Sequence, residues 1–404
     1  MKVGFVLSQP FGRSIGTDVR INGLIDGLSQ LGVEVHVITP FGEKISIHSK
    51  NVFVHGLSPN STKISNLKYR LSKGCIANPF LFKKVFCRES LLHRNARSLG
   101  EAVYEVARKL SLDILQAEQQ IASLACISVR ENLNVPVVAD FHGIWAEELV
   151  ASGLISYDDK CYQTICGIER EIACSADVAT VVSAEMKSYV ESSFGASASN
   201  VVVIPNAAFP RVDSARFVES PSKVIHSGTL HPWENSELFV EAMPYVLKRY
   251  PSAKFYFTRK GTKLKKIMKL AESLHVSPEF VWFEHGGDFL EFLKSCDIGV
   301  ISSTTHLARK MAYPAKLYDY LSVGLPVVAN DIGAWTNIIK KYEVGVVTAN
   351  DPKAFAEGIL VLLENPTFLY ECAERGVALV KHELNYYKTA ETLYRLYMRL
   401  LNTD

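Results

Sequence analysis

Short runs of consecutive apolar residues alternate along this chain with longer segments in which apolar residues recur every three or four positions. Unbroken apolar runs are typical of parallel strands covered on both faces, and the longer spacing is typical of amphipathic helices. Residues 17–31 have the helical spacing. The strands that we expect in the first half are KVGFVLS, VEVHVITP, DILQAE, VPVVADFH, DVATVVS and VVVIPN. This order predicts an α/β fold with a doubly wound parallel sheet.

The same alternation begins again after a polar, proline-containing segment near residues 207–222. The strands expected there are KVIHSG, KFYFTR, VWFEH, IGVISS, PVVAND and GVVTA, and residues 385–404 have the pattern of a final helix. A chain of 404 residues exceeds what one hydrophobic core usually serves. We therefore predict two Rossmann-like domains, residues 1–210 and 211–384, facing a cleft at the carboxyl ends of their strands.

Composition narrows the classes of protein that fit. The 48% hydrophobic and 21% charged content is that of an ordinary globular protein, and a net charge of +2 argues against a nucleic-acid partner. No apolar run reaches the roughly 18 residues of a membrane span. The eight cysteines are scattered without a CxxC pair or a zinc-like spacing, which favours unpaired thiols and a cytoplasmic location.

Two loops after predicted strands in the first half carry candidate site residues. Gly16 opens a predicted helix, where a glycine lets backbone N–H groups approach an anion, although it could simply serve a turn. His142 follows the run VPVVADF and could donate to a substrate oxygen or exchange a proton near neutral pH. A structural histidine bonded to a backbone carbonyl is the alternative.

In the second half, the loop after KVIHS contains Gly228 and Thr229, which can offer a backbone N–H and a hydroxyl to a phosphate. Arg259 ends the run KFYFTR and can form a bidentate contact with phosphate oxygens. A solvated basic surface is the alternative interpretation, and we prefer it for the lysines that follow Arg259.

The stretch MAYPAKLYDYLSVGLPVVAND, residues 311–331, places a lysine where a helix begins. Pro314 suits the helix start, so Lys316 falls in the first turn, where the helix dipole disfavours a cation unless an anion lies nearby. A phosphate held by the first-turn amides at Ala315 and by Lys316 would supply that anion. Asp319 and Tyr320 share this helix face, and the Asp319 carboxylate suits ribose hydroxyls. A surface ion pair between Lys316 and Asp319 is the alternative.

These segments resemble, in composition and order, those of the GT-B glycosyltransferases, and in particular the retaining enzymes of glycosyltransferase family 4. The resemblance covers nearly the whole chain. Its pieces are GTDVRINGLIDGLSQLGVEVHVITP, VPVVADFHG, ADVATVVS, VVVIPN, HSGTLHPWENSELFVEAM and, the most specific, PAKLYDYLSVGLPVVAND. It implies two Rossmann-like domains, with the final helix 385–404 packed back on the first. It also implies a nucleotide-diphosphate sugar donor, no required metal, and a glycan, lipid-linked or small-molecule acceptor.

The resemblance also implies roles for single residues. Asp319 matches the family's ribose-binding glutamate, His142 its cleft histidine and Gly16 its glycine loop. Glu284 and His285 fall where the family's loop meets the nucleobase.

Three positions depart from the family pattern. Met311 stands where the family commonly has the first of two glutamates, and Thr229 and Glu234 stand roughly where it has the arginine and lysine of the diphosphate site. We therefore expect Lys316 and Arg259 to supply the cations. These departures keep two other functions open, a nucleotide-sugar 2-epimerase and a catalytically silent GT-B-like subunit that binds a sugar or a partner.

A basic segment in the first half suggests contact with a membrane surface. Residues 44–97 contain eleven Lys or Arg against one acid, Glu89, interleaved with Phe80, Phe82 and Phe86. Such a segment could lie on an anionic bilayer near a lipid-linked acceptor. A solvated basic domain surface is the alternative, and we favour it.

Overall fold

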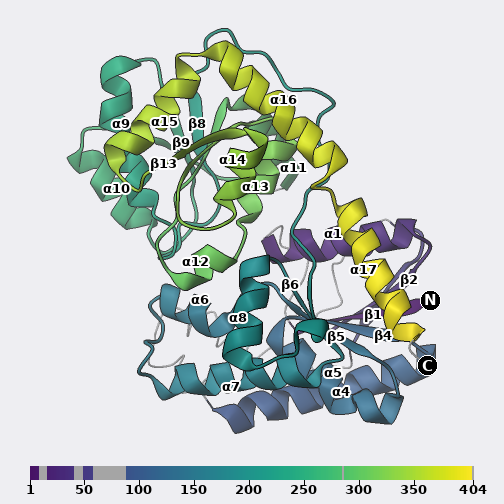
Figure 1. The fold of residues 1–404 in the computed structure, drawn as a ribbon. Helices are drawn as coiled ribbons and strands as arrows, with labels where there is room; N and C mark the ends of the chain where they lie inside the picture. Colours follow the sequence, from purple (N-terminus) through teal and green to yellow (C-terminus); the bar gives the residue numbers. More distant parts are fainter. Residues whose placement is uncertain (9–15, 41–48, 58–87, 284–285, 403–404) are drawn as a thin grey trace. The chain divides into compact units, whose positions relative to one another are not determined.

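The computed structural model describes residues 1–8, 16–40, 49–57, 88–283 and 286–402. The chain divides into two compact units, drawn with their connecting segments in Figure 1. Unit 1 is Met1–Pro205 together with Tyr386–Asp404, and unit 2 is Asn206–Asn385. Each unit is described by itself below.

Unit 1 is built on a sheet that has seven parallel strands within the described residues, in the order β3-β2-β1-β4-β5-β6-β7. The central strands β4 and β5 are buried along their whole length, as the apolar runs predict. In spatial order the strands are β3 (Val52–Gly56), β2 (Glu34–Thr39), β1 (Lys2–Leu7), β4 (Ile114–Glu118), β5 (Val137–Phe141), β6 (Val178–Val181) and β7 (Val201–Val203).

The helices of unit 1 connect these strands, and one of them comes from the other end of the chain. Its helices are α1 (Gly16–Gln30), α4 (Glu89–Leu110), α5 (Gln119–Leu133), α6 (Trp145–Ala151), α7 (Lys160–Ser175), α8 (Ala184–Phe194) and α17 (Tyr386–Leu401), with a 3₁₀ turn at Ala198–Asn200. Helix α17 lies against α1 (Figure 1). The two helices can approach closely because Gly23 and Gly27 have no side chain. A Cβ atom at Gly23 would overlap the Tyr386 ring, and one at Gly27 would overlap the Ala390 side chain. The last helix therefore belongs to the core of unit 1.

Unit 2 repeats the same plan with six parallel strands in its described part, in the order β10-β9-β8-β11-β12-β13. These strands are β10 (Glu279–Val281), β9 (Lys254–Thr258), β8 (Lys223–His226), β11 (Ile298–Ile301), β12 (Val327–Asn330) and β13 (Gly345–Thr348). Its helices are α9 (Ser236–Arg249), α10 (Leu264–Ser273), α11 (Gly286–Ser295), α12 (Leu307–Met311), α13 (Ala315–Ser322), α14 (Thr336–Tyr342), α15 (Pro352–Leu363) and α16 (Pro366–His382). The predicted doubly wound α/β fold is thus confirmed in both units.

Several local predictions need correction. Strand β3 was not expected, because its residues are only partly buried and lack an unbroken apolar run. The strand expected at VWFEH lies earlier than predicted: β10 is Glu279–Val281, and the Trp282 side chain that follows it is 61% exposed. The segment 207–222 packs on unit 2, where backbone N–H groups of Ala208 and Arg211 donate to carbonyls of that unit.

Two further observations concern cysteines and membranes. Among the described residues five cysteines are free, but Cys161 is disulfide-bonded, so the prediction of unpaired thiols is wrong at that residue. No helix within the described ranges is long and apolar enough to cross a membrane. Most of the basic segment 44–97, including Phe80, Phe82 and Phe86, lies outside the described residues.

Candidate active site

In both sheets the strand order reverses beside the first strand of the unit. The second and third strands lie on one side of it, and the fourth and later strands lie on the other. In such sheets, ligands bind beyond the carboxyl ends of the strands at this switch point. In unit 1 the point lies between β1 and β4, and in unit 2 it lies between β8 and β11. Each switch point is bordered by a cluster of buried polar side chains.

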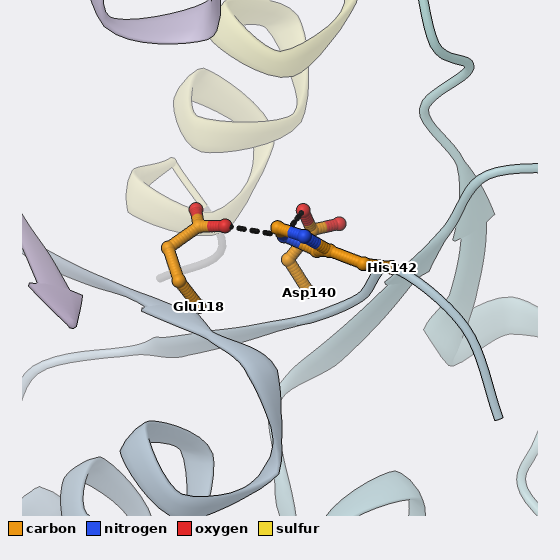
Figure 2. Close-up of side chains that lie close together, drawn as sticks. All are labelled: Glu118, Asp140 and His142. Carbon is orange, nitrogen blue, oxygen red and sulfur yellow. Dashed lines mark hydrogen bonds and ion pairs between the residues drawn. The ribbon is translucent and has the colours of Figure 1, made fainter. Parts of the chain in front are cut away.

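The cluster of unit 1 is formed by Glu118, Asp140 and His142 (Figure 2). Glu118 is the last residue of β4, Asp140 lies in the adjacent strand β5, and His142 comes directly after β5. The His142 Nε2 atom lies 2.7 Å from Glu118 Oε2 and 3.0 Å from Asp140 Oδ2. All three side chains are at least nine-tenths buried. His142 is therefore bonded to two carboxylates, not to a backbone carbonyl as the structural alternative supposed.

The two carboxylates are themselves held by buried partners. The Arg20 guanidinium of α1 donates to both oxygens of Asp140, at 2.9 and 3.0 Å, and Thr180 Oγ1 donates to Oδ1 at 2.6 Å. Glu118 accepts from Gln116 Nε2 at 3.2 Å, and Gln116 Oε1 accepts from the Tyr397 hydroxyl of α17 at 2.9 Å. These hydrogen bonds stabilise the buried carboxylates of Asp140 and Glu118.

Glu118, Asp140 and His142 bring their ligand atoms within 4.8 Å of one another, an arrangement that can also suit a cation. Here the Arg20 guanidinium already supplies positive charge to Asp140 and occupies both of its oxygens. With His142 protonated, the formal charges of Arg20, His142 and the two acids sum to zero. We therefore assign no metal to this cluster.

The protonation of His142 follows from these contacts. Burial alone disfavours its charged form, but the hydrogen bonds and charges of Asp140 and Glu118 outweigh it and raise the pKa of His142 to about 9. Burial likewise opposes ionisation of Asp140, but Arg20 and His142 hold the pKa of this carboxyl well below its usual range. Burial and the Asp140 charge raise the pKa of Glu118, and His142 and Arg20 oppose this shift. With Asp140 ionised beside it, the ring is held as an imidazolium whose Nε2–H faces both acids.

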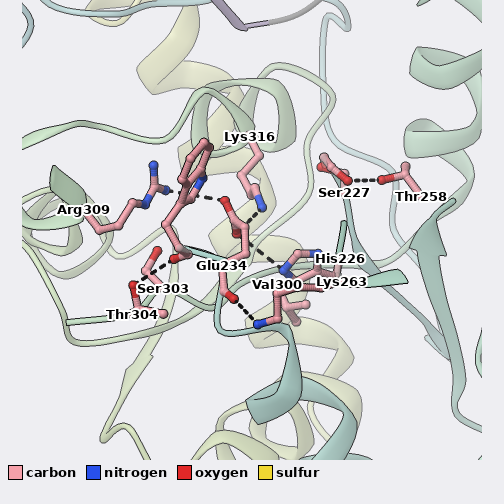
Figure 3. A network of polar contacts seen from close by, with 12 residues as sticks. His226, Ser227, Glu234, Thr258, Lys263, Val300, Ser303, Thr304, Arg309 and Lys316 are labelled. Carbon is pink, nitrogen blue, oxygen red and sulfur yellow. Dashed lines mark hydrogen bonds and ion pairs between the residues drawn. The ribbon is translucent and has the colours of Figure 1, made fainter. Parts of the chain in front are cut away.

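The cluster of unit 2 surrounds Glu234, which precedes α9 (Figure 3). Its Oε2 atom lies 2.8 Å from Lys316 Nζ, and its Oε1 atom lies 3.7 Å from Arg309 Nη2. Glu234 and Lys316 are both more than nine-tenths buried. The anion beside Lys316 is therefore a carboxylate of the chain itself, whereas we had expected a bound phosphate there.

The charges in this second cluster are strongly coupled. Burial alone would raise the pKa of Glu234, but Lys316 and Arg309 lower it to about 2. Burial lowers the pKa of Lys316, and Glu234 partly opposes this shift. Burial and the Lys316 charge lower the pKa of His226 to about 3, so this histidine is neutral. Glu234 carries one negative charge, and Lys316 and Arg309 carry one positive charge each. These three side chains together therefore have a net charge of +1.

Several buried polar atoms near Glu234 have no hydrogen-bond partner in the described part of the chain. They are both ring nitrogens of His226 at the end of β8, the hydroxyls of Ser302 and Ser303 after β11, the Ser236 hydroxyl at the start of α9, and Arg309 Nε. The loop that carries Glu234 pairs with the β11 end, since Asn235 N donates to Ser302 O at 3.1 Å. Buried polar groups are rarely left unpaired in native proteins. Their number at one switch point makes this cluster the candidate ligand site of unit 2.

Gly228 brings the backbone close to this site. It has a φ of +93°, which glycine tolerates, and a Cβ atom there would lie 3.4 Å from Lys316 Cε. Helix α13 begins at Ala315, so Pro314 is its N-cap residue and Lys316 its second residue. The structure thus brings Gly228, Ala315 and Lys316 together beside Glu234.

Other predicted residues of unit 2 lie in different surroundings. Asp319 is half-buried one turn after Lys316, and burial raises its pKa to about 6. Tyr320 is fully buried, with its hydroxyl bonded to Ser227 N at 2.7 Å and to the carbonyls of β8 and β11, so its side chain belongs to the core. Thr229 is half-buried, and Arg259 is exposed after β9.

The remaining predicted residues are less informative. Gly16 is the first residue of α1, and nothing further about it is described. Glu284 and His285 lie outside the described residues. Met311, at the end of α12, is buried.

Sequence reasoning missed the partners that complete both clusters. Glu118 and Asp140 were visible as acids inside apolar runs, which is a signal of a buried role. No such signal was present in the sequence for Arg20, Arg309 and His226, because their roles depend on contacts with residues that are distant along the chain.

Two family models match the chain. The model described as Glycosyltransferase Family 4 matches residues 16–208, and the model described as Glycosyl transferases group 1 matches residues 221–365. A search of curated protein sequences gave no significant match.

Solved structures with the same fold cover essentially the whole chain. Sucrose-phosphate synthase from Thermosynechococcus elongatus has a TM-score of 0.73 at 13% identity, covering 100% of both chains. A glycosyltransferase from Rickettsia africae has a TM-score of 0.69 at 14% identity, covering 100% of this chain and 99% of its own. Anabaena HepE in complex with UDP and glucose has a TM-score of 0.71 at 15% identity, covering 99% of this chain and 100% of its own. These structures share the GT-B fold of this chain, and the two family models, which together span most of it, place it in glycosyltransferase family 4, the group 1 enzymes that transfer a sugar from a nucleotide sugar.

Proposed function

We propose that this chain is a retaining glycosyltransferase that needs no metal ion. It moves a sugar from a nucleotide-diphosphate sugar to a glycan, lipid-linked or small-molecule acceptor. Unit 2 binds the donor, and unit 1 binds the acceptor. The observation that carries the proposal is the buried cationic group of Lys316 and Arg309 at the switch point of unit 2, surrounded by unpartnered polar atoms.

A diphosphate fits this group chemically. Its oxygen atoms accept hydrogen bonds, which suits the Ser303 hydroxyl and Arg309 Nε, two buried donors without a partner in the described part of the chain. The net positive charge favours an anion. When the sugar leaves, negative charge grows on the diphosphate, and fixed cations in a buried site stabilise it most effectively there.

Glu234 is the acid that faces these cations. Its carboxylate satisfies Lys316, which would otherwise be a buried charge without a partner. On binding, a donor phosphate takes over part of this role, and Glu234 becomes a competitor of the donor. This arrangement accounts for an acid where the family commonly has a lysine.

We propose a role for one further residue in each unit. The Asp319 carboxylate accepts hydrogen bonds from the ribose hydroxyls, one helical turn beyond the diphosphate. His142 of unit 1 offers a cationic N–H to an oxygen of the reacting sugar. Because HepE and other proteins of this fold were solved with UDP or UDP-glucose, UDP is the first nucleotide to test.

Donor hydrolysis across UDP-, GDP- and ADP-sugars tests this function. Slow release of nucleotide and of a free sugar with retained anomeric configuration, in the presence of EDTA, supports it. Release of an epimerised nucleotide sugar would instead support the 2-epimerase. No binding and no turnover of any donor would support a silent subunit.

We also propose a cytoplasmic location, with peripheral contact between residues 44–97 and an anionic membrane when the acceptor is lipid-linked. The free cysteines of the described residues favour this location, whereas the disulfide at Cys161 counts against it. The excess of eleven cations over one acid in that segment supports this contact. Flotation with anionic vesicles at low salt tests it. Equal flotation with neutral vesicles would contradict it.

A further inference from the structure

The hydrogen-bond pattern of His142 is asymmetric. Its Nε2 atom lies within hydrogen-bond distance of two carboxylates, whereas its Nδ1 atom is buried and has no partner in the described part of the chain (Figure 2). Since both neighbours of Nε2 are acceptors, the proton on this nitrogen is fixed. The orphan Nδ1 is the only ring atom left for a ligand.

We propose that Glu118 and Asp140 are positioning residues. Together they hold His142 as an imidazolium, so that Nδ1–H is a fixed cationic donor for an oxygen of the sugar being transferred. The part that concerns the sugar rests on the proposed function. The part that concerns the charge of His142 does not.

The groups that face His142 come from four elements. Glu118 lies on β4, Asp140 on β5 and Arg20 on α1, and the phenol of Tyr397 on α17 reaches the same cluster through Gln116. Arg20 neutralises one of the two acids. The second acid therefore decides whether the ring keeps its extra proton, and Glu118 is that acid, because Asp140 is the one bound to Arg20.

Glu118→Gln removes this negative charge and keeps the size and one acceptor oxygen of the side chain. We expect it to lower the proton affinity of His142 by about a hundredfold, within the usual range for a neighbouring charge at this distance. Asp140→Asn is a poorer choice, because it would also leave Arg20 buried without its acid.

The chain offers a matched control in unit 1. His93 Nε2 lies 2.8 Å from Glu171 Oε2, and this exposed pair is made of the same groups. Glu171→Gln should change the titration of His93 and leave that of His142 unaltered.

The test is an NMR pH titration of protein labelled at histidine Cε1, with the His142 signal assigned by its loss in His142→Gln. We expect wild-type His142 to stay protonated at pH 8 and the Glu118→Gln ring to be largely neutral there. The remaining histidine signals show whether the variant is folded. Titration of wild-type His142 near pH 6.5, or equal titration in both proteins, would overturn the proposal, whether or not any donor is turned over.

Activity tests the second part. Glu118→Gln should lower kcat for donor hydrolysis by about tenfold or more at pH 8 relative to wild type, and much less at pH 6, where its ring regains the proton. Glu118→Asp should restore part of the loss. An equal loss at both pH values would mean that the charge of His142 is not used on the sugar.

Discussion

The substitution Glu234→Gln tests the electrostatics of the proposed donor site in the absence of any ligand. In the wild type this carboxylate lies 2.8 Å from the buried Lys316 ammonium. Glutamine keeps the shape and an acceptor oxygen, but it leaves Lys316 and Arg309 without a countercharge. We expect unit 2 to become less stable.

The magnitude follows from the pKa of Glu234. It is lowered from 4.5 to about 2, which corresponds to roughly 3 kcal/mol in favour of the charged form. This value is at the lower end of the roughly 3–5 kcal/mol lost when one partner of a buried ion pair is removed. Unit 2 of the variant should therefore lose about 3 kcal/mol of unfolding free energy at pH 7.

Native-state hydrogen exchange can measure this loss for each unit separately. The slowest amides of β11 and β12 report on unit 2, and those of β4 and β5 report on unit 1 as an internal reference. Because the folded pKa of Glu234 lies below its unfolded value, its contribution is complete above about pH 4.5 and disappears as the pH falls through 2. The difference between wild type and variant should therefore shrink to less than half by about pH 3.

Glu237→Gln is the matched control, because Glu237 is also paired with two lysines, Lys263 just before α10 and Lys266 within it, but is more exposed than Glu234. It should cost at most about 1 kcal/mol. The reasoning is refuted if Glu234→Gln leaves unit 2 unchanged, or if its effect is the same at pH 7 and pH 3. The same variant should bind UDP about tenfold more tightly, since a phosphate then has no competitor for Lys316. Weaker binding would show that Glu234 assists the donor.

Two other predictions concern the neighbours of the two clusters. The pKa of Asp319 is raised to about 6 by burial, so the Kd for UDP should rise about tenfold between pH 7 and pH 5 as the carboxylate is protonated, and Asp319→Asn should remove this dependence in calorimetry. Tyr397→Phe removes the hydrogen bond to Gln116 and leaves a buried acceptor unpaired, at a cost of about 1–3 kcal/mol. Hydrogen exchange should locate this loss in β4 and β5, and an equal change in unit 2 would contradict it.

The fold could be predicted because its signal is local. Most strands of both sheets are buried on both faces, so they stand out as unbroken apolar runs such as VPVVAD and IGVIS. The exceptions have physical reasons. Strand β3 is half-exposed at the sheet edge, and Trp282 extends an apolar run beyond the end of β10 although its side chain faces solvent.

The candidate site could be predicted only in part. The position of Lys316 in the first turn of a helix correctly indicated a nearby anion, because helix ends are readable from sequence. The identity of that anion could not be predicted from the sequence, because Glu234 lies 82 residues earlier and contacts Lys316 only in the folded chain. Likewise, His142 was visible at a strand end, but its bonds to Glu118 and Asp140 depend on the order of β4 and β5 in the sheet.

Calorimetric titration with UDP of the wild type, Lys316→Ala and Lys340→Ala tests the central claim most directly. Lys340 is a suitable control, because it pairs with Asp331 at the surface of the same unit. If a donor diphosphate binds beside Lys316, its removal should raise the Kd by about tenfold or more, and Lys340→Ala should leave the Kd unchanged. Equal affinity of the wild type and Lys316→Ala would contradict the proposed donor site.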